Sequence, residues 1–170
     1  TRLPGKSLAP IMGKPLLQHL IERVRLASLV DDLVITTTLE DQDDGIVELA
    51  TELGVKCFRG SATDVLDRTY QAARRFNVEN IVRITGDCPL ADPTVIDLVV
   101  GVYLSGEYDY VTNTLTYPDA LGLEVFSQSV LKEAWKESQD PTYREHVTGY
   151  IRNSDRFRSF EVRNDVDLSH

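Results

Sequence analysis

Apolar residues recur along the chain at the three-to-four-residue period of an amphipathic α-helix, and short runs of β-branched residues separate these segments. Pro15 stands where a first helical residue is favoured, and Gly54 stands where a helix ends. The pattern predicts helices over about residues 15–28, 46–53, 65–76, 93–104 and 129–137, with a further helix beginning at Asp140-Pro141. It predicts strands at residues 33–37, 55–58, 80–85, 108–113, 123–127 and 158–163.

Strands and helices alternate through the first hundred residues, and this alternation predicts the fold class. We expect an α/β fold with a mostly parallel sheet and helices on both faces. The 170 residues suffice for one domain with a sizeable core. Such sheets bind ligands at the carboxyl ends of their strands, so the site is expected in loops 36–44, 59–64 and 86–92, and in residues 1–6 if a strand precedes them.

Charge and composition narrow the classes of function. The net charge of −9 disfavours nucleic acid as a partner, because phosphate backbones recruit Lys and Arg. No apolar run reaches the roughly 18 residues of a membrane span, and the sequence shows no secretory leader. Cys57 and Cys88 lack the spacing of a disulfide or zinc site, so we expect reduced thiols in a cytoplasmic protein. An anionic ligand then needs a local basic pocket or a metal ion.

The opening run TRLPGKSL contains Gly-Lys-Ser at residues 5–7, as at the end of a nucleotide-binding P-loop. That motif requires an earlier glycine, for which the chain has no room, and a helix that Pro10 opposes. Another interpretation is an extended anion-binding loop, with Arg2 and Lys6 reaching phosphates and Gly5 allowing close backbone approach. A solvated basic terminus is the remaining alternative.

The run TGDCPL places Asp87 directly after a predicted strand and a glycine, with Pro89 stiffening the turn. A carboxylate there suits a Mg²⁺ ion that bridges nucleotide phosphates, but Asp87 could equally cap the turn or the next helix. In the run FRGSATDVLDR, Ser61 and Asp64 are good helix caps, and contact with a nucleobase is the alternative. His146 falls in a predicted helix, where a lone histidine is more often structural.

Four groups of motifs, taken in order, resemble the cytidylyltransferase family. They are RLPGKSL with GKPLL, RGSATDVLDR, RITGDCPLADP, and EVFS with REHVTGYI. The closest group is the spore-coat polysaccharide cytidylyltransferases, while the CMP-sialic acid and CMP-3-deoxy-manno-octulosonate synthetases are more distant relatives. The resemblance covers nearly the whole chain and is specific for the family, though not for the sugar.

The resemblance implies a Rossmann-like nucleotidyltransferase fold, with CTP as a substrate and Mg²⁺ as the cofactor. The implied reaction transfers CMP from CTP to a sugar acid or a sugar phosphate and releases pyrophosphate, for surface polysaccharide biosynthesis. The expected partners are CTP and a small sugar acceptor, with no nucleic acid and no membrane. A homodimer is left open.

The resemblance also implies roles for individual residues. Lys6 and Arg2 would be catalytic by holding the triphosphate, and Asp87 would bind Mg²⁺. The nucleotide-binding residues would be Gly5, Ser61, Asp64, Thr85 and Gly86, and the acceptor-binding residues would be Glu124, Arg144 and His146.

In the family a first strand precedes the TRLPGK loop, and a second metal-binding acidic segment follows the last helix. Residues 1–170 are therefore expected to form a single nucleotidyltransferase domain that is truncated at both ends relative to the family. An Asp often stands in the family at the position of Gly122, and this departure leaves the acceptor sugar open.

Two other functions stay open at this stage. A sugar-nucleotide-dependent glycosyltransferase is expected to carry an Asp-x-Asp metal motif after a strand, and the run DVD at residues 165–167 has those letters. The second alternative is a non-catalytic nucleotide-binding or scaffolding domain of the same fold.

Overall fold

A computed structural model describes residues 5–169, and this part of the chain starts with a short 3-10 helix followed by a small hairpin. Met12 and Gly13 join its two strands with φ angles of 48° and 84°, the left-handed conformation that a two-residue hairpin turn needs. The elements of this segment are the 3-10 helix η1 (Lys6–Leu8) and the strands β1 (Pro10–Ile11) and β2 (Lys14–Pro15).

A parallel strand pair follows, connected by a helix as parallel strands require. The strands β3 (Val34–Thr38) and β4 (Lys56–Gly60) pair in register from Val34 with Lys56 to Thr38 with Gly60, so their carboxyl ends lie side by side. The connection contains the 3-10 helix η2 (Asp41–Asp43) and the helix α2 (Asp44–Glu52).

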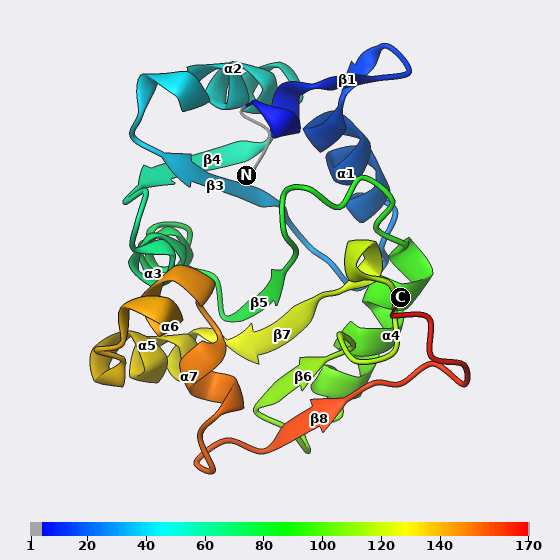
Figure 1. Cartoon of the computed structure of the whole chain (residues 1–170), viewed down its shortest axis with the longest axis vertical. Helices are drawn as coiled ribbons and strands as arrows, with labels where there is room; N and C mark the ends of the chain where they lie inside the picture. The colour runs from blue at the N-terminus through cyan, green and yellow to red at the C-terminus, as the bar shows by residue number, and fades with distance from the viewer. Residues whose placement is uncertain (1–4, 170) are drawn as a thin grey trace.

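The remaining strands form a four-stranded sheet in the order β5-β7-β6-β8 (Figure 1). The strand β7 runs antiparallel to both of its neighbours, while β8 runs parallel to β6. The carboxyl ends of β5 and β6 therefore lie beside the first residue of β7, at the same end of the strands of this sheet. The bounds are β5 (Asn80–Arg83), β6 (Tyr110–Thr112), β7 (Glu124–Ser127) and β8 (Ser159–Glu161).

Helices cover both faces of this sheet. Neighbouring residues of a strand point to opposite faces, and the two buried clusters separate accordingly. Val111 and Val125 pack into the cluster that contains α1 and α4, whereas Tyr110 and Phe126 pack into the cluster that contains α3, α5 and α7. The helices are α1 (Leu16–Val24), α3 (Val65–Arg75), α4 (Pro93–Leu104), α5 (Gln128–Glu137), α6 (Pro141–His146) and α7 (Gly149–Arg152).

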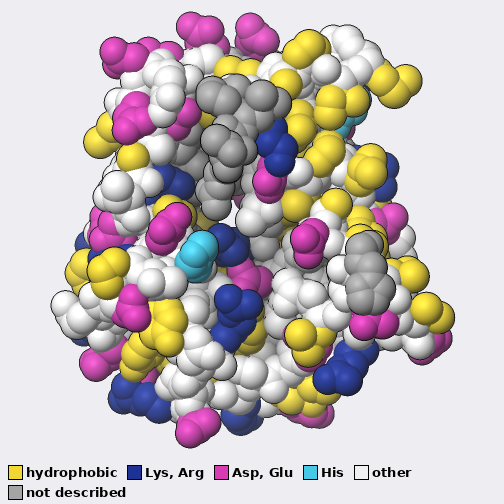
Figure 2. Space-filling model, in the orientation of Figure 1, with side chains coloured by type: hydrophobic (Ala, Val, Ile, Leu, Met, Phe, Trp, Pro, Cys, Tyr) yellow, Lys and Arg dark blue, Asp and Glu magenta, His cyan; other side chains and the backbone are white. Residues whose placement is uncertain are grey.

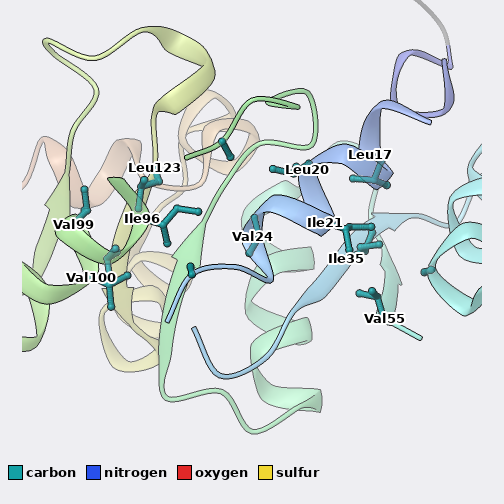
Figure 3. Close-up of a cluster of buried hydrophobic side chains, with 14 of the residues drawn as sticks. Leu17, Leu20, Ile21, Val24, Ile35, Val55, Ile96, Val99, Val100 and Leu123 are labelled. Carbon is teal, nitrogen blue, oxygen red and sulfur yellow. The ribbon is translucent and has the colours of Figure 1, made fainter. Parts of the chain in front are cut away.

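The first cluster joins the parallel pair to the four-stranded sheet. Figure 3 shows Leu17 and Ile21 of α1 beside Ile35 of β3, and Ile96, Val99 and Val100 of α4 at the other end of the cluster. Leu20 and Val24 of α1 lie between these two groups. Every one of these side chains is at most 9% exposed. Hydrophobic packing therefore connects β3–β4 with β5–β8, between which no ladder is formed among residues 5–169.

The predicted Rossmann-like α/β class with helices on both faces is confirmed, but its sheet is mixed rather than mostly parallel. The reason lies in the connection between β6 and β7, which contains only the 3-10 helix η3 (Asp119–Leu121). Without a crossover helix, the chain returns as an antiparallel neighbour. Within residues 5–169, no helix has the length and apolar character that crossing a membrane requires.

The first helix ends earlier than its apolar period predicts. It stops at Val24 rather than near residue 28, although Ala27 is still buried. The carboxylate of Asp97 accepts hydrogen bonds from the backbone N–H groups of Ser28 and Leu29, at 2.9 Å each. These bonds hold residues 28 and 29 in a turn. Ala27 therefore remains in the apolar core although the chain is no longer helical there.

Candidate active site

A cleft of about 550 Å³ opens at the edge of the four-stranded sheet where β5 and β6 end and β7 begins. This is the position at which open α/β sheets bind ligands. Near the centre of the face drawn in Figure 2, Lys or Arg side chains lie beside Asp or Glu side chains (Figure 2). The cleft is lined by Lys6, Arg83, Thr85, Asp87, Cys88, Thr114, Asp119, Ala120, Gly122, Leu123 and Glu124.

Two predicted site residues that are 81 positions apart meet at this cleft. Lys6 Nζ donates a hydrogen bond to Asp87 Oδ2 at 3.0 Å, and both side chains are about half exposed. Lys6 follows Gly5, whose φ of 68° lies in the left-handed region that glycine adopts without strain. The hydrogen bond from Lys6, and a further one from Thr85, hold the pKa of Asp87 below its ordinary value. Asp87 therefore presents an ionised carboxylate to the cleft.

The predicted metal role of Asp87 fits its surroundings. Mg²⁺ usually binds one or two carboxylates and completes its coordination with waters and substrate phosphates. Asp87 supplies one accessible carboxylate, next to a cation suited to phosphate. Within residues 5–169, no group of three or more His, Cys, Asp or Glu side chains is arranged as a metal cage. The donor set thus suits a magnesium ion that arrives with a polyphosphate.

A second charged group in the cleft centres on Glu124, which is only 6% exposed. Its Oε1 accepts hydrogen bonds from Tyr110 Oη at 2.6 Å and from Thr148 Oγ1 at 2.5 Å, and its Oε2 accepts one from Arg83. Burial, and then the charge of Glu124, raise the pKa of Tyr110, so its hydroxyl stays a donor. The carboxylate is thereby fixed by donors from three separate segments, and we call these four residues the Glu124 network.

Cys88 lines the same cleft, between Thr85 and Asp119. Its side chain is buried, and this burial raises the pKa of its thiol. A thiol that stays protonated is a weak nucleophile. We therefore assign Cys88 a packing role and derive no covalent step from it.

Asp64 is the N-cap of α3, the alternative role that the sequence left open, and Ser61 supports the turn that precedes this helix. Asp64 Oδ1 accepts the N–H of Asp67 at 2.8 Å at the start of α3, and Ser61 Oγ accepts the N–H of Asp64 at 2.9 Å. Neither residue lines the cleft of about 550 Å³. Their contact with the nucleotide stays a prediction, and their hydrogen bonds already explain why these residue types stand there.

The acceptor-binding residues predicted after α5 also lie outside the cleft lining. Arg144 donates from Nε to Asp64 Oδ2 at 2.7 Å, and from Nη1 to the carbonyls of Trp135 and Ser138. These bonds fasten α6 to α3 and to the end of α5. His146 is exposed at the end of α6. The acceptor roles of Arg144 and His146 stay predictions that these contacts do not require.

The glycine and threonine predicted beside Asp87 lie at the cleft or next to it. Thr85 lines the cleft, while Gly86 is exposed, and a Cβ atom added to it would meet no other atom within 4 Å. That open space permits close approach by a ligand. Arg2, the second predicted triphosphate residue, lies outside the described residues.

Arg83 is the main cleft residue that the sequence reasoning missed. The signal was present, because a single arginine interrupts the apolar strand NIVRIT. A charge in an apolar, half-buried strand needs a partner, and that partner proves to be Glu124. Thr148 and Tyr110, which complete the Glu124 network, carried no such signal.

Comparisons with known proteins agree with the predicted family. A family model described as "Cytidylyltransferase" matches residues 1–170. Protein MJ1063 of Methanocaldococcus jannaschii is 41% identical over 160 residues, which cover 94% of this chain and 65% of that protein. The spore coat polysaccharide biosynthesis protein SpsF of Bacillus subtilis is 35% identical over 158 residues, covering 90% of this chain and 65% of that protein. The chain thus spans just under two thirds of the length of both relatives.

A solved structure has the same fold over almost the whole chain. The structure of a cytidylyltransferase from Leptospira borgpetersenii superposes with a TM-score of 0.94 at 36% sequence identity. The match covers 99% of this chain and 73% of that chain. The mixed sheet and the placing of the helices are therefore shared with that protein.

Proposed function

The chain belongs to the cytidylyltransferase family, and from this premise we propose that the protein transfers CMP from CTP to a sugar acid or a sugar phosphate. An oxygen of the acceptor forms a bond to the α-phosphorus of CTP, and the bond from that phosphorus to the pyrophosphate breaks. The name of the relative SpsF supports a product used in surface polysaccharide biosynthesis.

The observation that carries the proposal is the Lys6–Asp87 pair at the cleft. Transfer of a nucleotidyl group needs little covalent chemistry from the protein. Positioning of the reactants and neutralisation of phosphate charge supply most of the rate acceleration. Lys6 offsets the charge of the triphosphate and the departing pyrophosphate. Asp87 would hold the Mg²⁺ ion, which when bound neutralises phosphate charge and orients the phosphates.

Without a nucleotide, Lys6 and Asp87 satisfy each other across 3.0 Å. Exposed ion pairs contribute only about 0–1 kcal/mol to stability, so a charged ligand separates them at little cost. Lys6 can then turn to a phosphate oxygen while the carboxylate of Asp87 turns to the metal. The ion pair thus keeps the Lys6 ammonium group and the Asp87 carboxylate beside the position where we propose that the triphosphate binds.

The test is release of pyrophosphate from each of the four ribonucleoside triphosphates, with Mg²⁺ and a panel of sugar acids and sugar phosphates. We expect release with CTP and with no purine triphosphate, and an activity about 100-fold lower in Lys6→Gln, the scale for losing one preorganised electrostatic contact. Lys14→Gln is the matched control, because Lys14 forms a similarly exposed pair with Glu22 at 2.9 Å, outside the cleft lining. A preference for a purine triphosphate contradicts the proposal.

The glycosyltransferase alternative depends on the run DVD at residues 165–167. Asp167 Oδ1 accepts hydrogen bonds from both the N–H and the hydroxyl of Ser169. Neither Asp165 nor Asp167 lines the cleft of about 550 Å³, so this run gives the alternative no structural support at that site. Calorimetric binding of CTP, without release of pyrophosphate in the assay above, would identify the scaffolding alternative.

A further inference from the structure

We propose that the outer side of α4 is a docking surface for a second copy of this chain, so that the protein forms a two-fold symmetric dimer. The surface consists of Leu98, Gly101 and Leu104 of α4 together with Leu29, and we call it the α4 face. None of these residues lines the cleft, so the inference does not depend on the proposed function.

The helix α4 is apolar on both of its sides. Ile96, Val99 and Val100 belong to the buried core, which they meet from one side of the helix (Figure 3). At 3.6 residues per turn, Leu98 and Gly101 lie on the opposite side. A surface helix normally carries polar residues there, whereas a helix that is apolar all round is usually buried. The sequence of α4 thus indicates that its outer side is covered in the working protein.

Within residues 5–169, the α4 face is open to solvent. Leu98 is 47% exposed, Leu104 is 57% exposed and Leu29 is 43% exposed. The Cδ1 atom of Leu29 lies 3.9 Å from the position that a Cβ atom on Gly101 would take, so Leu29 extends the apolar surface beyond the helix. Exposed apolar residues that are grouped in this way mark sites of protein–protein contact.

Asp97, the one charged residue in the sequence of α4, does not oppose burial of the α4 face. Its carboxylate accepts hydrogen bonds from the N–H of Ser28 at 2.9 Å, from the hydroxyl of Ser28 at 2.7 Å, and from the N–H of Leu29 at 2.9 Å. A charge with its own hydrogen-bond donors is covered at a lower cost in free energy than a charge without them. The same bonds hold Leu29 beside α4, so Asp97 helps to build the face.

Gly101 is a second observation that points to a partner. Glycine in the interior of a helix is destabilising relative to alanine, because it loses more conformational freedom on folding. The φ angle of Gly101 is not in the left-handed region, so the backbone does not require glycine. An added Cβ atom would meet only Leu29, at an ordinary van der Waals distance of 3.9 Å. Neither reason within one copy explains this glycine, whereas close approach of another backbone does.

The spacing around Gly101 selects a second copy of this chain as the partner. Leu98 lies three residues before Gly101, and Leu104 lies three residues after it. The contact across a two-fold axis uses the same surface of both copies, so that surface must complement itself. When two α4 helices cross antiparallel at Gly101, Leu98 of one copy lies level with Leu104 of the other. Large side chains then flank the point at which glycine lets the two backbones approach, and the α4 face is self-complementary.

The size and charge of the molecule predict a weak dimer. The 12 residues of α4 give a helix about 18 Å long and about 10 Å wide. This footprint is only a part of the roughly 800 Å² per partner that a standard interface buries. Each copy also carries a net charge of −9, so the two copies repel each other. We therefore expect a dissociation constant in the micromolar range and tighter association at higher salt.

Sedimentation equilibrium of the protein at about 1–200 µM tests the inference. We expect a monomer–dimer equilibrium that shifts toward the dimer when NaCl rises from about 0.1 M to about 0.5 M, because salt screens the like charges of the two copies. A monomer at every concentration overturns the inference and leaves the α4 face to a different partner. A dimer that dissociates as salt rises also overturns it, because ion pairs rather than apolar contacts then hold the copies together.

Leu98→Glu should weaken the dimer by about 100-fold or more, because the contact would bury a carboxylate without a partner. Leu39→Glu is the matched control, since Leu39 is an exposed leucine in the segment after β3 and lies outside the α4 face. Both positions are exposed in one copy, so both variants should fold and bind Mg²⁺-CTP as the unaltered protein does. Equal dimer affinity of the two variants contradicts the inference, whatever the outcome for CTP.

Gly101→Ala should change the stability of one copy and the affinity of the dimer in opposite directions. Alanine favours the helix, so the variant should melt at a higher temperature when measured at about 1 µM, where the monomer dominates. The added methyl group should weaken the dimer by about tenfold, because it separates the two backbones at their crossing. Dimer affinity that is unchanged in Gly101→Ala contradicts a contact at this residue.

Two double variants test the antiparallel crossing. Leu98→Lys combined with Leu104→Glu places opposite charges level with each other in the two copies, whereas Leu98→Glu combined with Leu104→Glu places like charges there. The first double variant should dimerise at least about tenfold more tightly than the second. Equal affinity of the two double variants overturns the arrangement around Gly101.

Discussion

At the scale of single residues, the cleft combines two ion pairs that differ in burial. Lys6 and Asp87 are each about half exposed, whereas the side chains of Arg83 and Glu124 are 24% and 8% exposed. Water screens the first pair, so it separates readily when a charged ligand binds. The second pair is enclosed by further donors and keeps one geometry. The Lys6–Asp87 pair is thus suited to exchanging partners when a ligand binds, whereas the Arg83–Glu124 pair is suited to keeping its side chains in one position.

Asp87→Asn should lower magnesium-dependent activity by about 100-fold or more, because a preorganised electrostatic contact is lost. The melting temperature should stay close to that of the unaltered protein, since an exposed ion pair contributes little stability. Glu22→Gln, which removes the carboxylate of the Lys14 pair, is the matched control. Steady-state kinetics and calorimetric melting decide the matter: unaltered turnover combined with a lower melting temperature would assign Asp87 a capping role only.

Lys6→Gln should raise the pKa of Asp87 toward its ordinary value, because the hydrogen bond from Lys6 is the largest cause of the depression. In the unaltered protein, a depressed pKa keeps the carboxylate ionised as the pH falls. Any stability that it contributes is fully present above the ordinary pKa of an aspartate, declines as the pH falls below that value, and is lost as the pH falls through the depressed pKa. Carboxyl NMR titration without metal measures the shift. An unchanged Asp87 pKa in Lys6→Gln would mean that the pair does not form in solution.

At the scale of elements, local sequence signals predicted the helices better than the strand directions. Asp140 caps α6 as predicted and Pro141 begins it, because cap and first-turn preferences depend only on neighbouring residues. The end of α1 depends on Asp97, about seventy positions away, and the reversal of β7 depends on a connection without a helix. Neither is encoded in the local pattern.

Asp92→Ala should lower the free energy of unfolding by about 1 kcal/mol through loss of the cap of α4. Asp92 Oδ1 accepts the N–H groups of Thr94 and Val95, at 2.8 Å and 3.2 Å. Urea denaturation measures the effect. Asp92→Asn preserves the cap, so its free energy of unfolding should remain within a few tenths of a kcal/mol of that of the unaltered protein. An equal loss of stability in both variants would indicate that the ion pair of Asp92 with Arg23, rather than the cap, is responsible.

At the scale of the whole molecule, the Glu124 network joins segments that are far apart in the sequence. Arg83 ends β5, Tyr110 begins β6, Glu124 begins β7, and Thr148 precedes α7. Sequence reasoning found the family and placed Lys6, Asp87 and Glu124 at the site through short motifs. It missed the network because a hydrogen bond between residues 83 and 124 follows from sheet register, which a single sequence does not reveal.

The expected strand before Thr1 stays a prediction. Among residues 5–169, no ladder joins β3–β4 to the sheet that contains β5. The acidic segment expected after His170 likewise remains a prediction from the resemblance.

Glu124→Ala should lower the free energy of unfolding by about 2 kcal/mol or more, because it leaves Arg83 without its counter-charge and two buried hydroxyls without their acceptor. Glu48→Ala, at an exposed position of α2, should cost much less. Urea denaturation of both variants gives the comparison. Equal stability of the two would show that the Glu124 network does not hold the sheet edge together.

Calorimetric titration measures whether Lys6 and Asp87 form a binding site for CTP with magnesium, because it needs no turnover. Mg²⁺-CTP is titrated into the unaltered protein, Lys6→Gln and Lys14→Gln. We predict binding to the unaltered protein and to Lys14→Gln, and an affinity about tenfold or more lower for Lys6→Gln, as for loss of a charged hydrogen bond. Equal affinity of the two lysine variants, or no binding of CTP to the unaltered protein, would contradict the account.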